Sequence, residues 1–299
     1  MLAENKYIDW SEISLKSKAY FKLLKFRLSF LVVFSSGMGY MLGVNHSIDW
    51  LHLIVFSLAG FFITGASNIL NQVIEKDIDK LMDRTKNRPL PTSVLSVSEA
   101  LIFAGILLVS AVYLFLTFIN LNAALLSVLS FVLYAFAYTP LKTRHPIAVF
   151  VGGIPGALPP MIGWVAATNK FGLEPGILFA IQFFWQLPHY WAIAWVLDDD
   201  YKKAGIRLLP NGGGKDVNTA FQIMIYTLFL VPLGFMPYLL GMTGIISAVI
   251  AVVCGVLFLA QTFYLMKKCS RKAALLIMFG SFLYLPIVQI AFVLDKVVK

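Results

Sequence analysis

The sequence predicts an all-α membrane protein, a polytopic bundle of about nine transmembrane helices in a single domain over residues 1–299. Of its 299 residues, 59% are hydrophobic and only 13% are charged, about half the charged share of an average soluble domain. The apolar residues gather in runs of roughly 20, the length of a membrane-spanning helix, without the short alternating segments of a β-barrel. This composition excludes a soluble enzyme and a disordered chain.

Residues 1–25 form the first element, for which the sequence predicts an amphipathic cytoplasmic helix at the lipid headgroups. Apolar Leu15, Phe21 and Leu23 are interleaved with Lys16 and Lys22, a pattern typical of helices that lie in the interface. We expect no signal peptide, because the first long apolar run begins late and no small-residue cleavage site follows it.

Nine apolar runs follow this segment. Each is long enough to cross a bilayer as a helix, in which the backbone polar groups are bonded within the segment. Polar breaks delimit these runs at residues 26–44, 51–74, 98–118, 122–140, 147–168, 176–197, 218–240, 242–265 and 273–294.

The basic residues divide unevenly between the two sides that nine crossings define. All but three of the 24 Lys and Arg residues fall with the N-terminus and the loops after the second, fourth, sixth and eighth runs; the exceptions are Lys170, Lys296 and Lys299. The positive-inside rule then predicts a cytoplasmic N-terminus. Topology accounts for the net charge of +9, so we expect no nucleic-acid partner.

The end of the second run carries a row of oxygen-bearing side chains. Asn71, Glu75, Asp79 and Asp83 are spaced by four, so a helix that continues to Pro89 would stack them on one face. Carboxylates in one row repel each other unless a cation lies among them. Mg²⁺ fits, since it binds a few carboxylates and keeps waters or substrate phosphates as its other ligands.

Further polar residues flank this row. Asn68 precedes it, and Arg84 and Arg88 follow it as donors suited to phosphate oxygens. The alternative is a helix end whose acids form ordinary salt bridges with neighbouring lysines. We favour a functional site, because ionisable groups at the edge of a membrane span are costly.

A second acidic cluster follows the sixth run. Asp198, Asp199 and Asp200 are adjacent. Because this loop is predicted on the same, cytoplasmic side of the membrane as the first cluster, the two clusters can lie near each other. The basic residues that accompany them are Lys202, Lys203 and Arg207. The two clusters together suggest Mg²⁺ around a diphosphate in a polar cavity at the cytoplasmic end, while a solvated loop is the alternative.

Two other segments provide candidate ligands for the cavity. The loop after the fourth run contains Tyr138, Lys142 and Arg144, which otherwise form a common basic anchor with an interfacial tyrosine. His189 lies among aromatic residues in the sixth run. It is either a buried, hydrogen-bonded histidine or one that binds a ligand or handles a proton.

These motifs resemble those of the membrane-embedded, UbiA-type prenyltransferases. The first motif is Asn71-xxx-Glu75-xxx-Asp79 with the Arg84-to-Pro89 segment, and the Tyr138 loop and the Asp-rich loop match as well. Within that family the chain is similar to the protohaem IX farnesyltransferases, or haem O synthases. The features that carry this likeness are Glu75 in place of an Asp, Gly156-Ala-Leu-Pro159-Pro160-Met-Ile-Gly163-Trp164, Pro188-His189 and Asp199-Asp200-Tyr201.

The resemblance implies transfer of the farnesyl group of farnesyl diphosphate to a vinyl group of haem B, in a bacterial inner membrane. It implies Mg²⁺ as cofactor and the next haem-modifying enzyme as a partner. By this likeness the diphosphate and Mg²⁺ would be held by Asn71, Glu75, Asp79, Asp199, Asp200, Arg84, Arg88 and Lys142. Tyr138, Tyr190 and Trp191 are candidates for attracting an allylic cation, and Arg144 and Arg207 for binding the haem propionates.

Two rival functions remain at this point. A prenyltransferase acting on an aromatic quinone precursor would share the diphosphate residues, but His189 stands where quinone-pathway relatives have an Asp. A transporter would place its substrate near the bilayer midplane, at broken helices. The glycines and prolines between Gly152 and Pro160 predict such a break in the fifth run.

Overall fold

Helices form along each of the apolar runs in the computed structural model of the chain, which describes residues 10–45, 47–210 and 214–298. Within these ranges the only extended pairing is a single bridge between Thr243 and Lys296. The first nine residues of the predicted lead-in helix, together with Lys299, lie outside the described residues.

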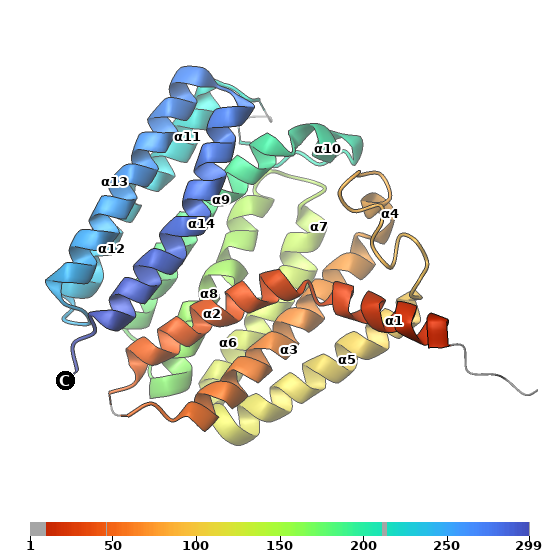
Figure 1. Cartoon of the computed structure of the whole chain (residues 1–299), viewed down its shortest axis with the longest axis horizontal. Coiled ribbons are helices and arrows are strands. Elements are labelled where there is room, and N and C mark those ends of the chain that lie inside the picture. Colours follow the sequence, from red (N-terminus) through yellow and green to blue (C-terminus); the bar gives the residue numbers. More distant parts are fainter. Residues whose placement is uncertain (1–9, 46, 211–213, 299) are drawn as a thin grey trace, which may run out of the picture.

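The elements follow one another along the chain as helices, with long loops only between α4 and α5 and between α10 and α11 in the described residues (Figure 1). Their bounds are α1 Trp10–Leu23, α2 Phe26–Gly43, α3 Trp50–Ile74, α4 Lys76–Asp79, α5 Val97–Leu114, η1 Phe115–Ile119, α6 Leu121–Val132, η2 Leu133–Tyr138, α7 Thr139–Leu141, α8 Ala148–Thr168, α9 Leu173–Val196, α10 Asp198–Lys203, α11 Val217–Leu228, α12 Leu230–Leu239, α13 Ile245–Lys268 and α14 Arg271–Leu294. The segments η1 and η2 are π-helical continuations of α5 and α6.

The nine predicted runs are found as nine long helical segments in the described part of the chain. Eight of them are long and apolar enough to cross a membrane. The ninth, α9, has 24 residues but a lower hydropathy, because it carries the buried polar side chains Gln182, Gln186 and His189.

The α2 and α8 helices pack with almost no space between their backbones. A Cβ atom added to Gly39 would strike the backbone of Pro160, and one added to Gly163 would strike the backbone of Ser36. Glycine permits this approach, which is typical of helix pairs in membranes. Elsewhere α3 packs on α5, and α9 packs on both α8 and α14. The buried apolar residues form two clusters, one around α9 and α11–α14 and the other around α2, α3, α5 and α6.

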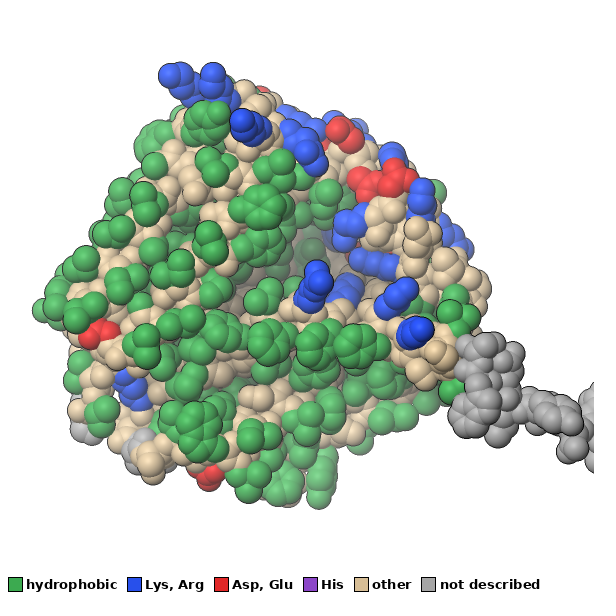
Figure 2. All heavy atoms as spheres, in the orientation of Figure 1, with side chains coloured by type: hydrophobic (Ala, Val, Ile, Leu, Met, Phe, Trp, Pro, Cys, Tyr) green, Lys and Arg blue, Asp and Glu red, His purple; other side chains and the backbone are tan. Residues whose placement is uncertain are grey.

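The charged loops lie at one end of the bundle. The short helices α4 and α10 are found together at this end, away from the C-terminus (Figure 1). Lys, Arg, Asp and Glu side chains gather at the top and right of Figure 2, whereas hydrophobic side chains cover most of the remaining face. The α1 helix lies at the same end and is tied to α5 by an ion pair between Lys16 and Glu99 at 2.9 Å.

The predicted break in the fifth run is wrong: α8 is one helix from Ala148 to Thr168, with three prolines inside it. Proline lacks an N–H and leaves the carbonyl four residues earlier without its helical donor. Pro160 frees the carbonyl of Gly156, which accepts a hydrogen bond from Gln182 Nε2 at 2.8 Å. Pro159 frees the carbonyl of Pro155, which accepts one from Ser130 Oγ at 3.1 Å. Neighbouring helices therefore supply hydrogen-bond donors in place of the backbone N–H groups that the prolines lack.

Candidate active site

The junction of α3 and α4 carries three of the predicted acidic-row residues. Asn71 lies in the last turn of α3, Glu75 is the residue at which α3 ends, and Asp79 ends α4. Their exposed fractions are 3%, 2% and 0%. Burial of two carboxylates is costly unless cations accompany them, so the partners of these side chains decide what the site can bind.

Each of the three side chains meets a different cation. Lys25 Nζ donates to Asn71 Oδ1 at 3.0 Å, and Lys142 Nζ lies 3.0 Å from Glu75 Oε1. The shortest pair joins Arg88 Nη1 to Asp79 Oδ2 at 2.6 Å. Acids suited to a metal therefore alternate with cations suited to phosphate oxygens.

Lys25 is a site residue that the sequence analysis did not identify. It lies between α1 and α2 in a left-handed conformation, with a φ of 47°, which is uncommon outside glycine and asparagine. Burial, followed by repulsion from Arg88, lowers the pKa of Lys25 to about 7. For Lys142, burial is the largest cause and lowers the pKa, but the attraction and hydrogen bond to Glu75, together with Tyr201 and Tyr134, leave that pKa above its ordinary value.

The predicted continuation of the helix to Pro89 is wrong beyond Asp79. In a continuing helix the carbonyl of Asp79 would bond to the amide of Asp83. Instead this carbonyl accepts a hydrogen bond from the Thr85 hydroxyl at 2.8 Å, and the Asp83 amide donates to Asp200 Oδ1 at 2.8 Å. Asp83 therefore leaves the helix and does not join the buried row.

Asp83 and Asp200 instead connect the loop after α4 to the short helix α10. Lys86 lies 2.7 Å from the Asp83 carboxylate, which also pairs with Lys203. Hydrogen bonds from Lys203 and then from Lys86 lower the pKa of Asp83 to about 2. Asp200 accepts the backbone N–H groups of Asp83 and Arg84 at 2.8 and 3.4 Å. The loop after α4 and the α10 helix are thereby joined.

The remaining acids of the second cluster differ in exposure. Asp198 is buried and pairs with Lys202 at 2.7 Å and with Lys215 at 3.4 Å. The Asp199 side chain is 87% exposed and lies 3.3 Å from Lys215. Neither contacts the buried row, so the structure does not gather the six predicted metal ligands in one place.

The donor set of the buried row nevertheless fits Mg²⁺. In the described ranges, no group of three His, Cys, Asp or Glu side chains is arranged to hold a metal. Asp79 Oδ1 is buried there and has no hydrogen-bond partner, a state that costs about 1–3 kcal/mol. A hard cation would satisfy this oxygen, and Asn71 and Glu75 offer further oxygens beside it.

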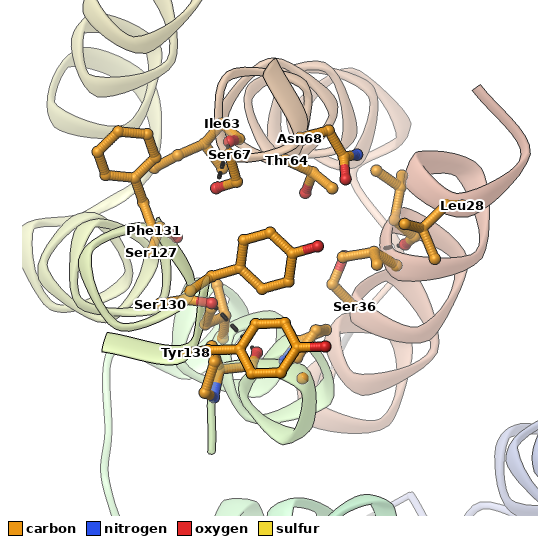
Figure 3. Close-up of a pocket in the computed structure, with 18 of the residues that line it drawn as sticks. Leu28, Ser36, Ile63, Thr64, Ser67, Asn68, Ser127, Ser130, Phe131 and Tyr138 are labelled. Atoms are coloured by element: carbon orange, nitrogen blue, oxygen red, sulfur yellow. Dashed lines mark hydrogen bonds between the residues drawn. The ribbon is translucent and has the colours of Figure 1, made fainter. Parts of the chain in front are cut away.

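A cavity of about 350 Å³ extends from the loop end of the bundle into the spans. Its lining includes Arg84 and Tyr201 at that end and Phe56 and Phe115 at the other. Figure 3 shows Ile63, Thr64, Ser67 and Asn68 of α3 facing Ser127, Ser130 and Phe131 of α6 and Leu28 and Ser36 of α2, with Tyr138 at the lower edge of this group. Predicted residues Asn68, Arg84, Tyr138 and Tyr190 line this cavity.

Two tyrosines beside Tyr138 were not predicted from the sequence. Tyr134 and Tyr138 both lie on the π-helical segment η2, with ring centroids 5.4 Å apart. Tyr201 also lines the cavity, and its ring centroid lies 5.8 Å from Lys142 Nζ. No sequence pattern predicts a π-helical turn, although such turns are frequent at functional sites.

His189 and Trp191 do not line the cavity, although both were predicted to bind substrate. His189 Nδ1 lies 2.7 Å from Ser281 Oγ on α14, and its ring stacks on Trp185. Trp191 packs edge-on against Phe150, with ring centroids 5.5 Å apart. Because consecutive helix positions point about 100° apart, only Tyr190 of this segment faces the cavity.

The other predicted substrate-binding cations are exposed at the loop end of the bundle. Arg144 and Arg207 are exposed. Lys202 and Lys203 are also exposed, and they are engaged by Asp198 and Asp83. The structure brings none of the four into the buried row.

Comparisons with known proteins agree with this architecture. A relative from Cytophaga hutchinsonii, named protoheme IX farnesyltransferase, is 60% identical over 280 residues, covering 94% of this chain and 98% of the relative. A solved structure described as digeranylgeranylglyceryl phosphate synthase in membranes is 25% identical, with a TM-score of 0.79 over 94% of this chain and 98% of that one.

A second solved structure is that of a UbiA homologue from Archaeoglobus fulgidus bound to GPP and Mg²⁺. It is 16% identical, with a TM-score of 0.64 over 92% of this chain and 99% of that chain, and it supports the fold alone. The model of the UbiA prenyltransferase family matches residues 32–285. Together with the 60% identical relative, this match establishes that the chain belongs to the UbiA prenyltransferase family.

Proposed function

We propose that this chain transfers the farnesyl group of farnesyl diphosphate to a vinyl group of haem B, giving haem O and diphosphate. One observation carries the proposal: an alternating group of acids and cations, formed around Asn71, Glu75 and Asp79, adjoins an apolar cavity inside the spans. An amphiphile with a highly charged head and a hydrocarbon tail has the chemistry that such a junction recognises. The name of the 60% identical relative supports farnesyl and haem as the groups involved.

The diphosphate would be bound by Lys25, Arg84, Arg88 and Lys142. Three of these cations already approach the row within 3.0 Å, and Arg84 lines the cavity. Asn71, Glu75 and Asp79 would hold Mg²⁺, which when bound stabilises negative charge on phosphate oxygens. The chain's own cations stabilise the same charge as it develops on the leaving group.

The reaction begins with cleavage of the bond between the allylic carbon and the diphosphate oxygen, which takes the electron pair. Tyr134, Tyr138 and Tyr190 line the cavity, so their ring faces can attract the allylic cation. The terminal carbon of the vinyl group then bonds to this carbon. Water adds to the cation left beside the porphyrin ring and loses a proton, which gives a hydroxyethylfarnesyl group.

The location of the reaction follows from the charge pattern. The chain is a multi-pass membrane protein by its apolar helices. We place it in a bacterial inner membrane with the row of acids on the cytoplasmic side, where the basic loops gather. Its product would pass to the next haem-modifying enzyme of that membrane.

The test is incubation of the purified protein in lipid with farnesyl diphosphate, Mg²⁺ and either haem B or 4-hydroxybenzoate, followed by mass analysis. We expect a farnesylated, hydrated haem and no prenylated benzoate. Prenylated benzoate without modified haem would instead support the quinone-pathway alternative. Asp77→Asn serves as a control for substitutions in the row, because the Asp77 side chain is 86% exposed and pairs only with Lys80 within the described residues.

A further inference from the structure

The cavity follows a single stripe of α3. Its lining positions on this helix are Phe56, Gly60, Ile63, Thr64, Ser67 and Asn68, which recur at helical spacing on one face. The first and the last are twelve positions apart, which corresponds to about 18 Å along the helix. Asn68 lies one turn from Asn71, so the stripe begins beside the row of acids and leads away from it.

Aromatic side chains close the end of the cavity that lies farthest from the row. Phe56 and Phe115 are each 1% exposed, and their rings meet edge to face with centroids 6.0 Å apart. Tyr40 stacks on Phe56 at 5.7 Å, and its hydroxyl lies 2.8 Å from His52 Nδ1. We refer to Tyr40, Phe56 and Phe115 together as the aromatic floor of the cavity.

Three serine hydroxyls in the cavity wall are already hydrogen-bonded to the backbone. Ser36 Oγ donates to the carbonyl of Val33 at 2.9 Å, and Ser67 Oγ donates to the carbonyl of Ile63 at 3.0 Å. Ser130 Oγ donates to a carbonyl of α8 at 3.1 Å. Hydroxyls that donate to backbone carbonyls in this way have no proton left for a ligand. A hydrocarbon can therefore lie against these three serines without leaving their hydroxyl protons unpaired.

Gly60 lies one helical turn above Phe56 in the stripe. A Cβ atom added there would meet only Val33 Cγ2, at an ordinary contact distance of 3.8 Å. The position is therefore open to a larger side chain, which would extend into the cavity without displacing backbone. The same side chain would shorten the space available above the aromatic floor.

We propose that Gly60 and the aromatic floor determine the length of the prenyl chain that this protein accepts. This inference rests on the proposed function, because it assigns the cavity to the hydrocarbon tail of the diphosphate substrate. The diphosphate is fixed at the row of acids and cations, so the distance from that row to the floor limits how many isoprene units fit. Gly60 keeps the last part of this distance free.

The first test is the substitution Gly60→Leu. Affinities of the geranyl, farnesyl and geranylgeranyl thiolodiphosphates are measured on the purified protein with Mg²⁺ and without haem. We expect the preference for farnesyl over geranyl to fall by about tenfold or more, because the terminal isoprene unit loses its burial. Geranyl affinity should remain near that of the unmodified protein.

Gly105→Leu is the matched control. Gly105 lies on α5, is exposed, and would gain a Cβ with nothing within 4 Å. It does not line the cavity in the described part of the chain. The same change of residue should therefore leave the preference for farnesyl within about twofold, which separates shortening of the cavity from a general effect on the helices.

The opposite change is Phe56→Leu, which removes part of the floor while keeping an apolar side chain. We expect geranylgeranyl affinity to rise relative to farnesyl affinity. Unchanged preferences in both Gly60→Leu and Phe56→Leu, in folded protein that binds the farnesyl analogue, would overturn the inference while leaving the proposed function intact. If the unmodified protein binds none of the three analogues, the proposed function fails instead.

Discussion

Asp79 shows why one carboxylate of a row can matter more than its neighbours. It is fully buried, one oxygen pairs with Arg88, and the other has no partner within the described residues. We predict that Asp79→Asn lowers the turnover of haem farnesylation by about 10²–10³-fold, the usual loss when a group that stabilises developing charge is removed.

The assay for this prediction is product formation at saturating Mg²⁺, with protein amount checked by size-exclusion chromatography. Asp77→Asn, two residues away and exposed, should retain near-normal turnover. A well-folded Asp79→Asn protein with normal product formation would refute the assignment of the buried row to the diphosphate and its metal.

Lys25 provides a prediction about pH. Because its pKa is lowered to about 7, the fraction that carries a charge falls as the pH rises from 6 to 8.5. If the charged form binds diphosphate, affinity for inorganic diphosphate should fall over this interval. Lys25→Arg stays charged throughout, since arginine is not deprotonated in proteins, and its affinity should fall less.

Calorimetric titration at several pH values measures both affinities, and the arginine variant corrects for the titration of diphosphate itself. Lys25→Met should bind diphosphate weakly at every pH. Parallel curves for the unmodified protein and Lys25→Arg would mean that the charge of Lys25 does not enter the binding equilibrium.

His189 has a tautomer that its neighbours determine. Ser281 Oγ donates its proton to the carbonyl of Met278 at 2.6 Å, so it must accept from His189 Nδ1. The other ring nitrogen, Nε2, then carries a lone pair, as in histidines that ligate metals while a second residue orients them. We predict that His189→Ala changes the visible absorption spectrum of added haem B and leaves farnesyl thiolodiphosphate affinity unchanged.

Ser281→Ala removes the hydrogen-bond partner that fixes the tautomer of His189 but keeps the imidazole. It should therefore give a smaller spectral change than His189→Ala. An identical haem spectrum in His189→Ala would identify His189 as a residue of helix packing between α9 and α14. In that case the haem iron would have no ligand at this position, and its contacts would have to come from the cavity.

At the scale of elements, α8 depends on side chains of other helices for its continuity. Gln182 supplies the donor that Pro160 removes, and the carbonyl left without it would be buried. We predict that Gln182→Leu destabilises the protein by about 1–3 kcal/mol. In a Pro160→Ala background, where residue 160 has its own N–H, the cost should be smaller.

Thermal unfolding of the four proteins in one detergent gives the interaction energy between the two positions as a double-mutant cycle. Gln182 also contacts Ser35 and Gln289, so a residual cost should remain in the Pro160→Ala background. If the changes in the free energy of unfolding caused by Gln182→Leu and Pro160→Ala were additive, Gln182 would not compensate for the N–H group that Pro160 lacks.

The nine long helical segments of the described residues could be predicted from the sequence because the length and apolar content of a run are properties of each segment alone. The break at Asp79 and the continuity of α8 could not, since both depend on partners far along the chain: Asp200 for the first and Gln182 for the second. The buried row was predicted by its spacing of four. Lys25 was not, because nothing in the sequence distinguishes it from the other lysines before the first span.

At the scale of the whole molecule, the uneven distribution of charge predicts orientation. Lys and Arg side chains gather at the end of the bundle that holds α4 and α10 (Figures 1 and 2), and the positive-inside rule predicts that this end faces the cytoplasm. We predict that a periplasm-active reporter fused after Lys299 is active, while one inserted in the loop after α4 is inactive. Activity of the cytoplasmic reporter after Lys299 would require an even number of crossings.

The aromatic floor has a consequence for the membrane in which the protein works. A charged, hydrated site that reached from one face of a bilayer to the other would let protons leak and dissipate the membrane potential, which is worth about 2.3 kcal/mol per charge at 100 mV. Phe56, Phe115 and Tyr40 close the cavity before it reaches the second face. The protein can thus handle a multiply charged substrate within an energised membrane while that membrane remains electrically sealed.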